Sequence, residues 1–96
     1  MTSRLLRLEF EVFGRVQGVF FRKYTKKKSE ELGLKGWCMN TDKNTVQGVV
    51  EGATESINTM KKWLREEGSP NSKIENAVFN EQPITQLSFQ HFEIRR

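Results

Sequence analysis

The sequence predicts an α+β fold, a ferredoxin-like β-α-β-β-α-β sandwich with two helices on one face of an antiparallel sheet and a short extra C-terminal strand. Three observations predict it: strand-type alternation near the N-terminus, two segments with apolar residues at helical spacing, and a hairpin signal between two further strand candidates. The 96 residues are expected to form a single domain over 1–96, because this length leaves no room for a second core.

The N-terminal part of the chain is predicted to form a strand and then a helix. Apolar residues alternate with mostly charged ones from Leu6 to Phe13, which indicates a strand with one buried face. A loop with two glycines follows. A helix is expected from about Arg22 to Leu32, and Gly33 provides its C-terminal stop. The side chains expected on the inner side of this helix are Phe21, Tyr24, Thr25, Ser29 and Leu32.

The remaining strands are predicted from alternation and turn chemistry. Segments 34–41 and 45–51 are strand candidates, and Asp42-Lys43-Asn44 between them is a good hairpin turn. A fourth strand is expected over 73–80. A short last strand over 91–95 completes the pattern.

The second helix is predicted more clearly than the first. Its apolar residues at helical spacing are Ala53, Ile57, Met60 and Leu64. Thr54 is expected to cap the start of this helix, and Gly68 with Pro70 is expected to end it.

The predicted topology brings two distant segments together. If the first strand runs up, the first helix returns down and the second strand runs up again. The carboxyl ends of these two strands therefore lie at the same edge of the sheet. The glycine loop ends the first strand and Asn40-Thr41 ends the second, so we expect Asn40 to lie near Arg22.

The net charge of +4, from 16 basic and 12 acidic residues, favours anionic partners without fixing their size. The simplest interpretation of the run Lys26-Lys27-Lys28 is a solvated helix face. No apolar run approaches the roughly 20 residues that span a membrane, so no membrane partner is expected. One cysteine, Cys38, and the absence of a signal-peptide pattern predict a cytoplasmic location.

The most informative segment is the loop between the first strand and the first helix. Its residues are Gly14, Arg15, Val16, Gln17, Gly18, Val19 and Phe20. Glycines accept positive φ angles and carry no Cβ, so successive backbone N–H groups can turn toward one point. The next helix adds unpaired N–H groups and a positive dipole end, and Arg22 stands where it begins. The segment is predicted to bind phosphate, although its spacing matches neither a P-loop nor a dinucleotide fingerprint.

Longer stretches resemble a known family. Gly14-Arg-Val-Gln-Gly-Val-Phe-Phe-Arg22, Gly36-Trp-Cys-Met-Asn40-Thr41 and Val46-Gln-Gly-Val-Val-Glu-Gly52 are similar to the acylphosphatase pattern, as are Met60-Lys-Lys-Trp-Leu64, Gly68-Ser-Pro70 and Phe92-Glu-Ile-Arg95. The resemblance runs from about Glu9 to the C-terminus. It implies a small, metal-independent hydrolase of the carboxyl–phosphate bond. It also implies that Arg22 binds phosphate, that Asn40 holds the attacking water and that Gly14 to Phe20 form the phosphate loop.

The acyl phosphate hydrolysis that this resemblance implies needs few catalytic residues. No clustered carboxylates, His/Cys ligand set or nucleophile–base pair occurs in the sequence, so no metal or other cofactor is expected. His91 and Cys38 are each interpreted as structural. An acyl phosphate leaves as a carboxylate whose conjugate acid has a pKa of roughly 4, so it needs no general acid. Thr41 has two possible interpretations. In the first its side chain steadies that of Asn40, and in the second it is an ordinary threonine at the end of a strand.

The expected partners are a small-molecule acyl phosphate as substrate and inorganic phosphate as product, with no nucleic acid. The physiological acyl phosphate stays open, and nothing in the sequence indicates more than a monomer. The first alternative is an RNA-binding ferredoxin-like module, which would stack bases on aromatic residues of its first and third strands. The third strand over 45–51 has no aromatic residue, and Phe10 and Phe13 lie on opposite faces of the first. The second alternative is a noncatalytic phosphate-binding interaction domain, against which Arg22 and Asn40 argue.

Overall fold

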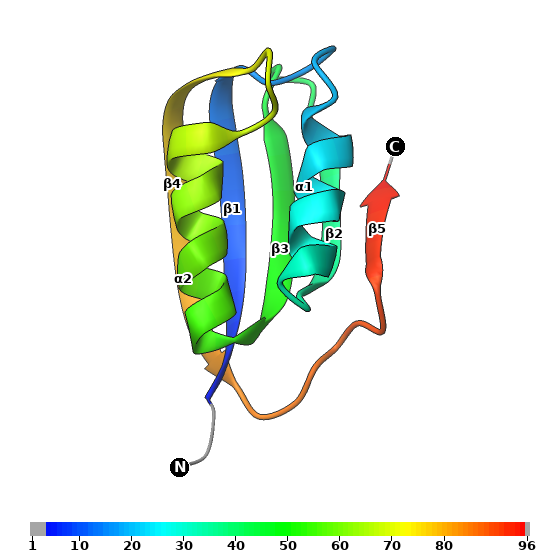
Figure 1. The fold of residues 1–96 in the computed structure, drawn as a ribbon, viewed down its shortest axis with the longest axis vertical. Coiled ribbons are helices and arrows are strands. Elements are labelled where there is room, and N and C mark those ends of the chain that lie inside the picture. The colour runs from blue at the N-terminus through cyan, green and yellow to red at the C-terminus, as the bar shows by residue number, and fades with distance from the viewer. Residues whose placement is uncertain (1–3, 96) are drawn as a thin grey trace.

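Two helices cover one face of a five-stranded sheet in the computed structural model, which describes residues 4–95 (Figure 1). The elements are β1 (Leu5–Arg15), α1 (Phe21–Glu31), β2 (Lys35–Asn40), β3 (Val46–Ala53), α2 (Thr54–Lys62), the π-helix η1 (Trp63–Glu67), β4 (Lys73–Ile84) and β5 (Phe92–Arg95). The predicted ferredoxin-like α+β fold, with its short extra C-terminal strand, is confirmed.

The strand order explains how distant segments meet. The sheet runs β4-β1-β3-β2-β5, and its neighbours are antiparallel except for β2 and β5, which are parallel. Val46 of β3 pairs with Val12 of β1 on one side and with Asn40 of β2 on the other. The carboxyl ends of β1 and β2 therefore lie at the same edge of the sheet, as the topology predicts.

The core lies between the sheet and the two helices. On β1 the alternation is clean: Leu8 and Val12 are fully buried beneath the helices, whereas Glu9 between them is exposed. The predicted inner side of α1 is confirmed, because Phe21, Thr25 and Ser29 are buried and Tyr24 and Leu32 pack against the core. The Phe21 ring lies 5.6 Å from the ring of Trp63 in η1, so the two helical segments share one apolar cluster.

Some predicted boundaries were wrong. Thr54 does not cap α2 through its side chain, because its hydroxyl donates to the main-chain oxygen of Arg4 at 3.0 Å. The second helix also changes its winding after Lys62, where η1 begins, although it ends before Gly68 as expected. The predicted fourth strand stops at Asn80, whereas β4 continues to Ile84.

The connection from β4 to β5 runs past one end of the sheet (Figure 1) and is held there by a buried carboxylate. Glu51 is fully buried; it accepts a hydrogen bond from Arg7 Nε at 2.6 Å and another from the backbone N–H of Ser88 at 2.6 Å. A buried charge is tolerated when it is paired and hydrogen-bonded in this way. These contacts secure the segment that carries the chain from β4 to β5.

Candidate active site

The glycine loop is shaped by two different requirements. Gly14 ends a bulge in the pairing of β1 with β4 and has φ 123°, and a Cβ there would collide with the main-chain oxygen of Lys73. Gly18 has φ 73° in open space, so only its left-handed conformation favours glycine. Val16 and Val19 are buried on either side of it. The loop is thus anchored in the core while Gly18 stays exposed.

One side chain ties the loop to the turn after β2. Gln17 Nε2 donates to the main-chain oxygens of Thr41 and Thr45, both at 2.9 Å. These two carbonyl groups flank the β2–β3 turn. The Gln17 side chain therefore fixes the loop relative to the residues that follow Asn40.

The start of α1 leaves its donors uncapped. Phe20 precedes the helix with φ 59° and ψ 25°, a left-handed conformation that is uncommon for a residue with a Cβ. Its side chain makes no capping hydrogen bond, and the first turn carries no acidic residue. The first N–H groups of a helix have no partner within the helix, and they carry a positive partial charge. This helix end is accordingly suited to an anion.

A cavity of about 320 Å³ lies where the loop meets α1. Its lining residues are Val16, Gly18, Phe20, Phe21, Arg22, Lys23 and Ile94. Arg22 is half-buried, and within residues 4–95 no carboxylate lies at ion-pair distance from its guanidinium. A guanidinium without an acidic partner in such a cavity is a strong donor for a phosphate or carboxylate ligand.

Cys38 lies beneath this cavity and is chemically quiet. It is fully buried, and its thiol lies 3.9 Å from the main-chain oxygen of Arg22. Burial raises the pKa of Cys38 to about 12, and the nearby Arg22 charge opposes this shift without cancelling it. Burial disfavours the thiolate, and the place of Cys38 in the core agrees with its interpretation as a packing residue. The same contact places the start of α1 against β2.

Asn40 ends β2 with an unsatisfied acceptor. Its Oδ1 is buried and has no hydrogen-bond partner among the described residues. Such orphaned buried oxygens are uncommon in native proteins and are often satisfied by an ordered water. The position is therefore one at which a water molecule would gain a partner.

A chain of hydroxyl groups orders the turn after Asn40. Thr45 Oγ1 donates to Glu11 Oε2 at 2.6 Å, so the 2.6 Å contact between the two threonine hydroxyls has Thr41 as its donor. Thr41 Oγ1 also accepts from the backbone N–H groups of Lys43 and Thr45. Within residues 4–95 no hydrogen bond joins the Thr41 side chain to Asn40.

Comparison with known proteins identifies the family of this chain. The acylphosphatase family model matches residues 8–94. Acylphosphatase-2 of Cavia porcellus is 47% identical over 94 residues, covering 97% of this chain and 95% of the relative. An acylphosphatase structure from Coxiella burnetii is 36% identical with a TM-score of 0.84, covering 96% of this chain and 94% of that one. An acylphosphatase structure from Bacillus subtilis is 28% identical with a TM-score of 0.88, covering 95% and 99%.

The chain belongs to the acylphosphatase family. It is accordingly an enzyme, a hydrolase of the acylphosphatase class.

Only some of the residues that the sequence predicts for the site of this acylphosphatase line the cavity. Val16, Gly18, Phe20 and Arg22 line it, whereas Gly14, Arg15, Gln17, Val19 and Asn40 do not. Three lining residues were not among the predicted site residues: Phe21, which was expected only on the inner side of the helix, Lys23 and Ile94. Lys23 was not among the predicted site residues, although its place in the first turn of α1, next to Arg22, favours an anion there. Ile94 gives no sequence signal, because only the pairing of β5 with β2 brings it there.

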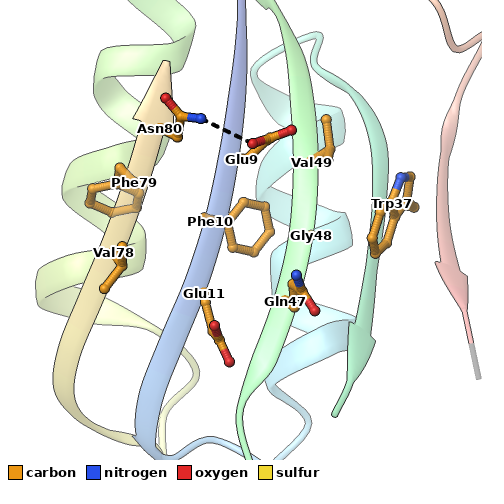
Figure 2. Close-up of a pocket in the computed structure, with 10 residues that line it drawn as sticks. All are labelled: Glu9, Phe10, Glu11, Trp37, Gln47, Gly48, Val49, Val78, Phe79 and Asn80. Carbon is orange, nitrogen blue, oxygen red and sulfur yellow. Dashed lines mark hydrogen bonds between the residues drawn. The ribbon is translucent and has the colours of Figure 1, made fainter. Parts of the chain in front are cut away.

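A second hollow of about 320 Å³ lies on the sheet face away from the helices. Figure 2 shows the carboxylates of Glu9 and Glu11 standing over it, with Glu9 accepting a hydrogen bond from Asn80 at 3.2 Å. None of its lining residues is basic. Phe10 is almost completely buried. An RNA-binding module would use this face, and two carboxylates repel phosphates, so the RNA-binding alternative is not favoured.

No group of three or more His, Cys, Asp or Glu side chains within residues 4–95 is arranged to hold a metal ion. No helix in the same range is long and apolar enough to cross a bilayer.

Proposed function

We propose that the protein hydrolyses the carboxyl–phosphate bond of acyl phosphates, releasing a carboxylate and inorganic phosphate. The observation that carries the proposal is the Arg22 guanidinium, which lacks an acidic partner among the described residues and shares a cavity with the glycine loop and the uncapped start of α1. These are the groups that bind a phosphoryl group in place of a metal ion.

Arg22 and the loop divide the phosphate oxygens between them. The planar guanidinium donates two parallel hydrogen bonds to two oxygens and keeps its charge at every physiological pH. Backbone N–H groups from Arg15 to Phe20 bind the remaining oxygen. A loose phosphoryl-transfer transition state asks chiefly for positioning and charge stabilisation, which these fixed donors supply.

Asn40 holds the attacking water in this proposal. Its Oδ1, which has no protein partner among the described residues, accepts a hydrogen bond from the water and orients it for attack in line with the leaving carboxylate. The Asn40 amide is too weak a base to take a proton from the attacking water, so an oxygen of the substrate phosphate accepts that proton. The new P–O bond forms from the water oxygen as the bond to the carboxylate oxygen breaks.

The carboxylate leaves without help from an acid or a metal ion. Its conjugate acid has a pKa of about 4, so it is a stable anion at neutral pH. A phosphomonoester releases a far more basic alkoxide, for which the proposed residues offer no acid. Selectivity for acyl phosphates and independence of divalent metals therefore go together in this proposal.

We also propose that a single chain in the cytoplasm carries out the reaction. A free buried thiol such as Cys38 is ordinary in a reducing compartment.

The test measures phosphate release from acetyl phosphate and from methyl phosphate, whose leaving group is an alkoxide, each with and without excess EDTA. We expect hydrolysis of acetyl phosphate at the same rate with EDTA and little hydrolysis of the phosphomonoester. Loss of activity in EDTA that a divalent ion restores would contradict the mechanism. Binding of phosphate without turnover of any acyl phosphate would instead support the noncatalytic phosphate-binding domain.

A further inference from the structure

The hollow on the open face of the sheet, which the helices leave uncovered, has no part in the proposed reaction (Figure 1). No residue lines both this hollow and the cavity that contains Arg22. None of residues 85–91, which connect β4 to β5, lines it either. A hollow of about 320 Å³ on an uncovered face is large enough to receive part of another molecule.

The strand register places two acidic side chains next to each other in this hollow. Glu9 and Glu11 flank the buried Phe10 on β1, so both carboxylates point to the open face, as Figure 2 shows. Residues two apart on a strand are separated by about 7 Å, which is close enough for the two charges to repel each other. Their cross-strand neighbours on β3 and β4 are uncharged: Val49, Gln47, Val78 and Asn80.

The two carboxylates have no basic partner among the described residues. Within residues 4–95 no ion pair includes Glu9 or Glu11, although opposite charges across a sheet would stabilise it. One oxygen of each accepts a hydrogen bond, from Asn80 at 3.2 Å and from Thr45 at 2.6 Å, and in the same residues the other oxygen accepts none. A chain with 16 basic residues thus leaves two neighbouring acids unneutralised, and a bound cation would relieve their repulsion.

Apolar surface adjoins the two carboxylates. Val78 is 53% exposed and Val49 is half-buried, and each is the cross-strand neighbour of one of the acids. Trp37 pairs with Val49 from β2 and lines the same hollow, and its ring already accepts a guanidinium, since Arg95 Cζ lies 4.5 Å from the ring centroid. A carboxylate beside an aliphatic side chain suits lysine and arginine, which have an apolar stem and a cationic head.

We infer that this hollow is a docking site for a basic, extended segment of a partner protein, whose arginine or lysine side chains bind Glu9 and Glu11 while their stems cover Val49 and Val78. An extended segment presents every second side chain to the same face, about 7 Å apart, which is the spacing of the two acids on β1. Basic residues two positions apart therefore match the two carboxylates one to one. The inference goes beyond the proposed reaction and does not depend on it, because the reaction uses the other cavity.

Other occupants fit the hollow less well. A second copy of this chain carries the same net charge of +4, so the two copies repel each other. A small cation such as free arginine neutralises one carboxylate and leaves the other unpaired. A basic segment with two cationic side chains pairs both acids and covers the apolar surface beside them.

The experiment titrates the full protein into labelled peptides at low ionic strength and follows their fluorescence anisotropy. The first probe is a short threonine-rich peptide whose two arginines are two positions apart, and we expect a Kd below about 1 mM. A peptide of the same composition with adjacent arginines should bind about threefold more weakly, because one arginine then points away from the hollow. The same peptide with glutamates in place of the arginines should not bind. Inorganic phosphate should displace the first peptide no more than sodium chloride of equal ionic strength does.

The variants localise the binding. Glu9→Gln and Glu11→Gln each keep an oxygen that can accept the existing hydrogen bond, and each should weaken binding about threefold, or about tenfold together. Glu55→Gln is the matched control, since it removes one exposed carboxylate from α2 on the covered side of the sheet and should leave the Kd unchanged. Circular dichroism checks that every variant is folded. Should the double variant not fold, the two single variants decide.

Several results would overturn the docking site. These are equal affinity for all three peptides, an unchanged Kd in the folded Glu9 and Glu11 variants, or an equal loss in Glu55→Gln. If free arginine binds as tightly as the first peptide, the occupant is a small cation and not a protein segment. If the protein alone self-associates in sedimentation and the double variant does not, the occupant is a second copy of the chain.

Discussion

The side-chain amide of Gln17 donates a hydrogen bond to the main-chain oxygen of Thr41 at 2.9 Å. Gln17 lies in the proposed phosphate loop, and Thr41 directly follows the proposed water-holding Asn40. The two halves of the site come from segments that are distant in sequence, so a rigid link between them matters more than either segment alone. A misplacement of about 1 Å between reacting groups can lower an enzymatic rate about a hundredfold.

The first prediction concerns this link. Gln17→Ala removes two hydrogen bonds, so we expect unfolding free energy to fall by about 2 kcal/mol and Tm by roughly 10 °C. The rate should fall because the loop loses its register with Asn40. Gln17→Glu should weaken phosphate binding further, because a carboxylate would face two carbonyl oxygens near a bound anion. Thermal unfolding and acetyl phosphate kinetics measure these effects. Equal phosphate affinity in the two variants would contradict this electrostatic argument.

Arg22 is predicted to act on both binding and turnover. Replacing Arg22 by Gln removes charge-assisted hydrogen bonds worth about 4 kcal/mol together, so kcat/KM should fall about a thousandfold and phosphate binding should weaken. Arg22→Lys should rescue little, because a point charge does not reproduce a two-donor fork. Lys27→Gln is the matched control, since it removes one exposed charge from the same helix outside the cavity. A similar loss in that control would show that net charge, rather than Arg22, is responsible.

Asn40 is predicted to act on turnover alone. Asn40→Ala should leave phosphate affinity within about twofold of the wild type while kcat falls about a hundredfold, which is close to 3 kcal/mol of transition-state stabilisation. Because Oδ1 has no protein partner in the described residues, its removal should not unfold the protein, as circular dichroism can check. A folded variant with normal kcat, or one that loses phosphate binding as fully as Arg22→Gln, would rule out the proposed division of roles.

Inorganic phosphate is predicted to stabilise the folded protein. A ligand that binds only the folded state at a hundredfold excess over its Kd adds about 2.7 kcal/mol, which raises Tm by about 10 °C or more in a domain of this size. The shift should disappear in Arg22→Gln and persist in Lys27→Gln. If phosphate neither raises Tm nor competes with substrate, the loop is not a phosphate site.

Cys38 is predicted to make stability depend on pH above 9. The unfolded thiol ionises near pH 9, whereas burial raises the folded pKa to about 12. The contribution of the Cys38 thiol to the free energy of unfolding is constant below pH 9. It is lost between pH 9 and 12, at about 1.4 kcal/mol per pH unit. Cys38→Ala should be less stable at pH 8, and its deficit should shrink by that amount with each unit above 9. Urea unfolding of both proteins at pH 8, 9 and 10 measures this. A constant deficit would contradict the raised pKa.

Much of the fold could be predicted because periodicity reports burial directly. The alternation from Leu6 to Phe13 marks a strand whose helix-facing side is buried. The end of β4 could not be predicted in this way, because Glu81, Gln82 and Pro83 show no apolar alternation. The strand continues because Leu5 and Leu6 of β1 pair with it, and proline is tolerated on an edge strand.

The candidate site could be proposed from the sequence where local chemistry marks it, but not where tertiary pairing builds the cavity. Two glycines and Arg22 identify the loop because glycine favours a left-handed turn and a basic residue at an uncapped helix start favours a bound anion. Ile94 looks like any strand residue, and its place at the cavity depends on the parallel pairing of β5 with β2. The change from α2 to the π-helix η1 also could not be predicted from the sequence, since Trp63 and Leu64 are adjacent and both buried.

The position of β1 between β4 and β3 has a consequence for the kinetics of folding. This first strand of the chain forms its ladders with β3 and with β4, so it pairs residues as distant as Leu5 and Ile84. Large loops must close before those contacts form, and the entropy of closure is lost before any burial offsets it. The helices can form locally within microseconds, whereas the sheet that aligns Gly18 with Asn40 depends on the slowest encounters in the chain. The catalytic geometry is therefore expected to appear late, on the millisecond-to-second timescale of β-rich topologies.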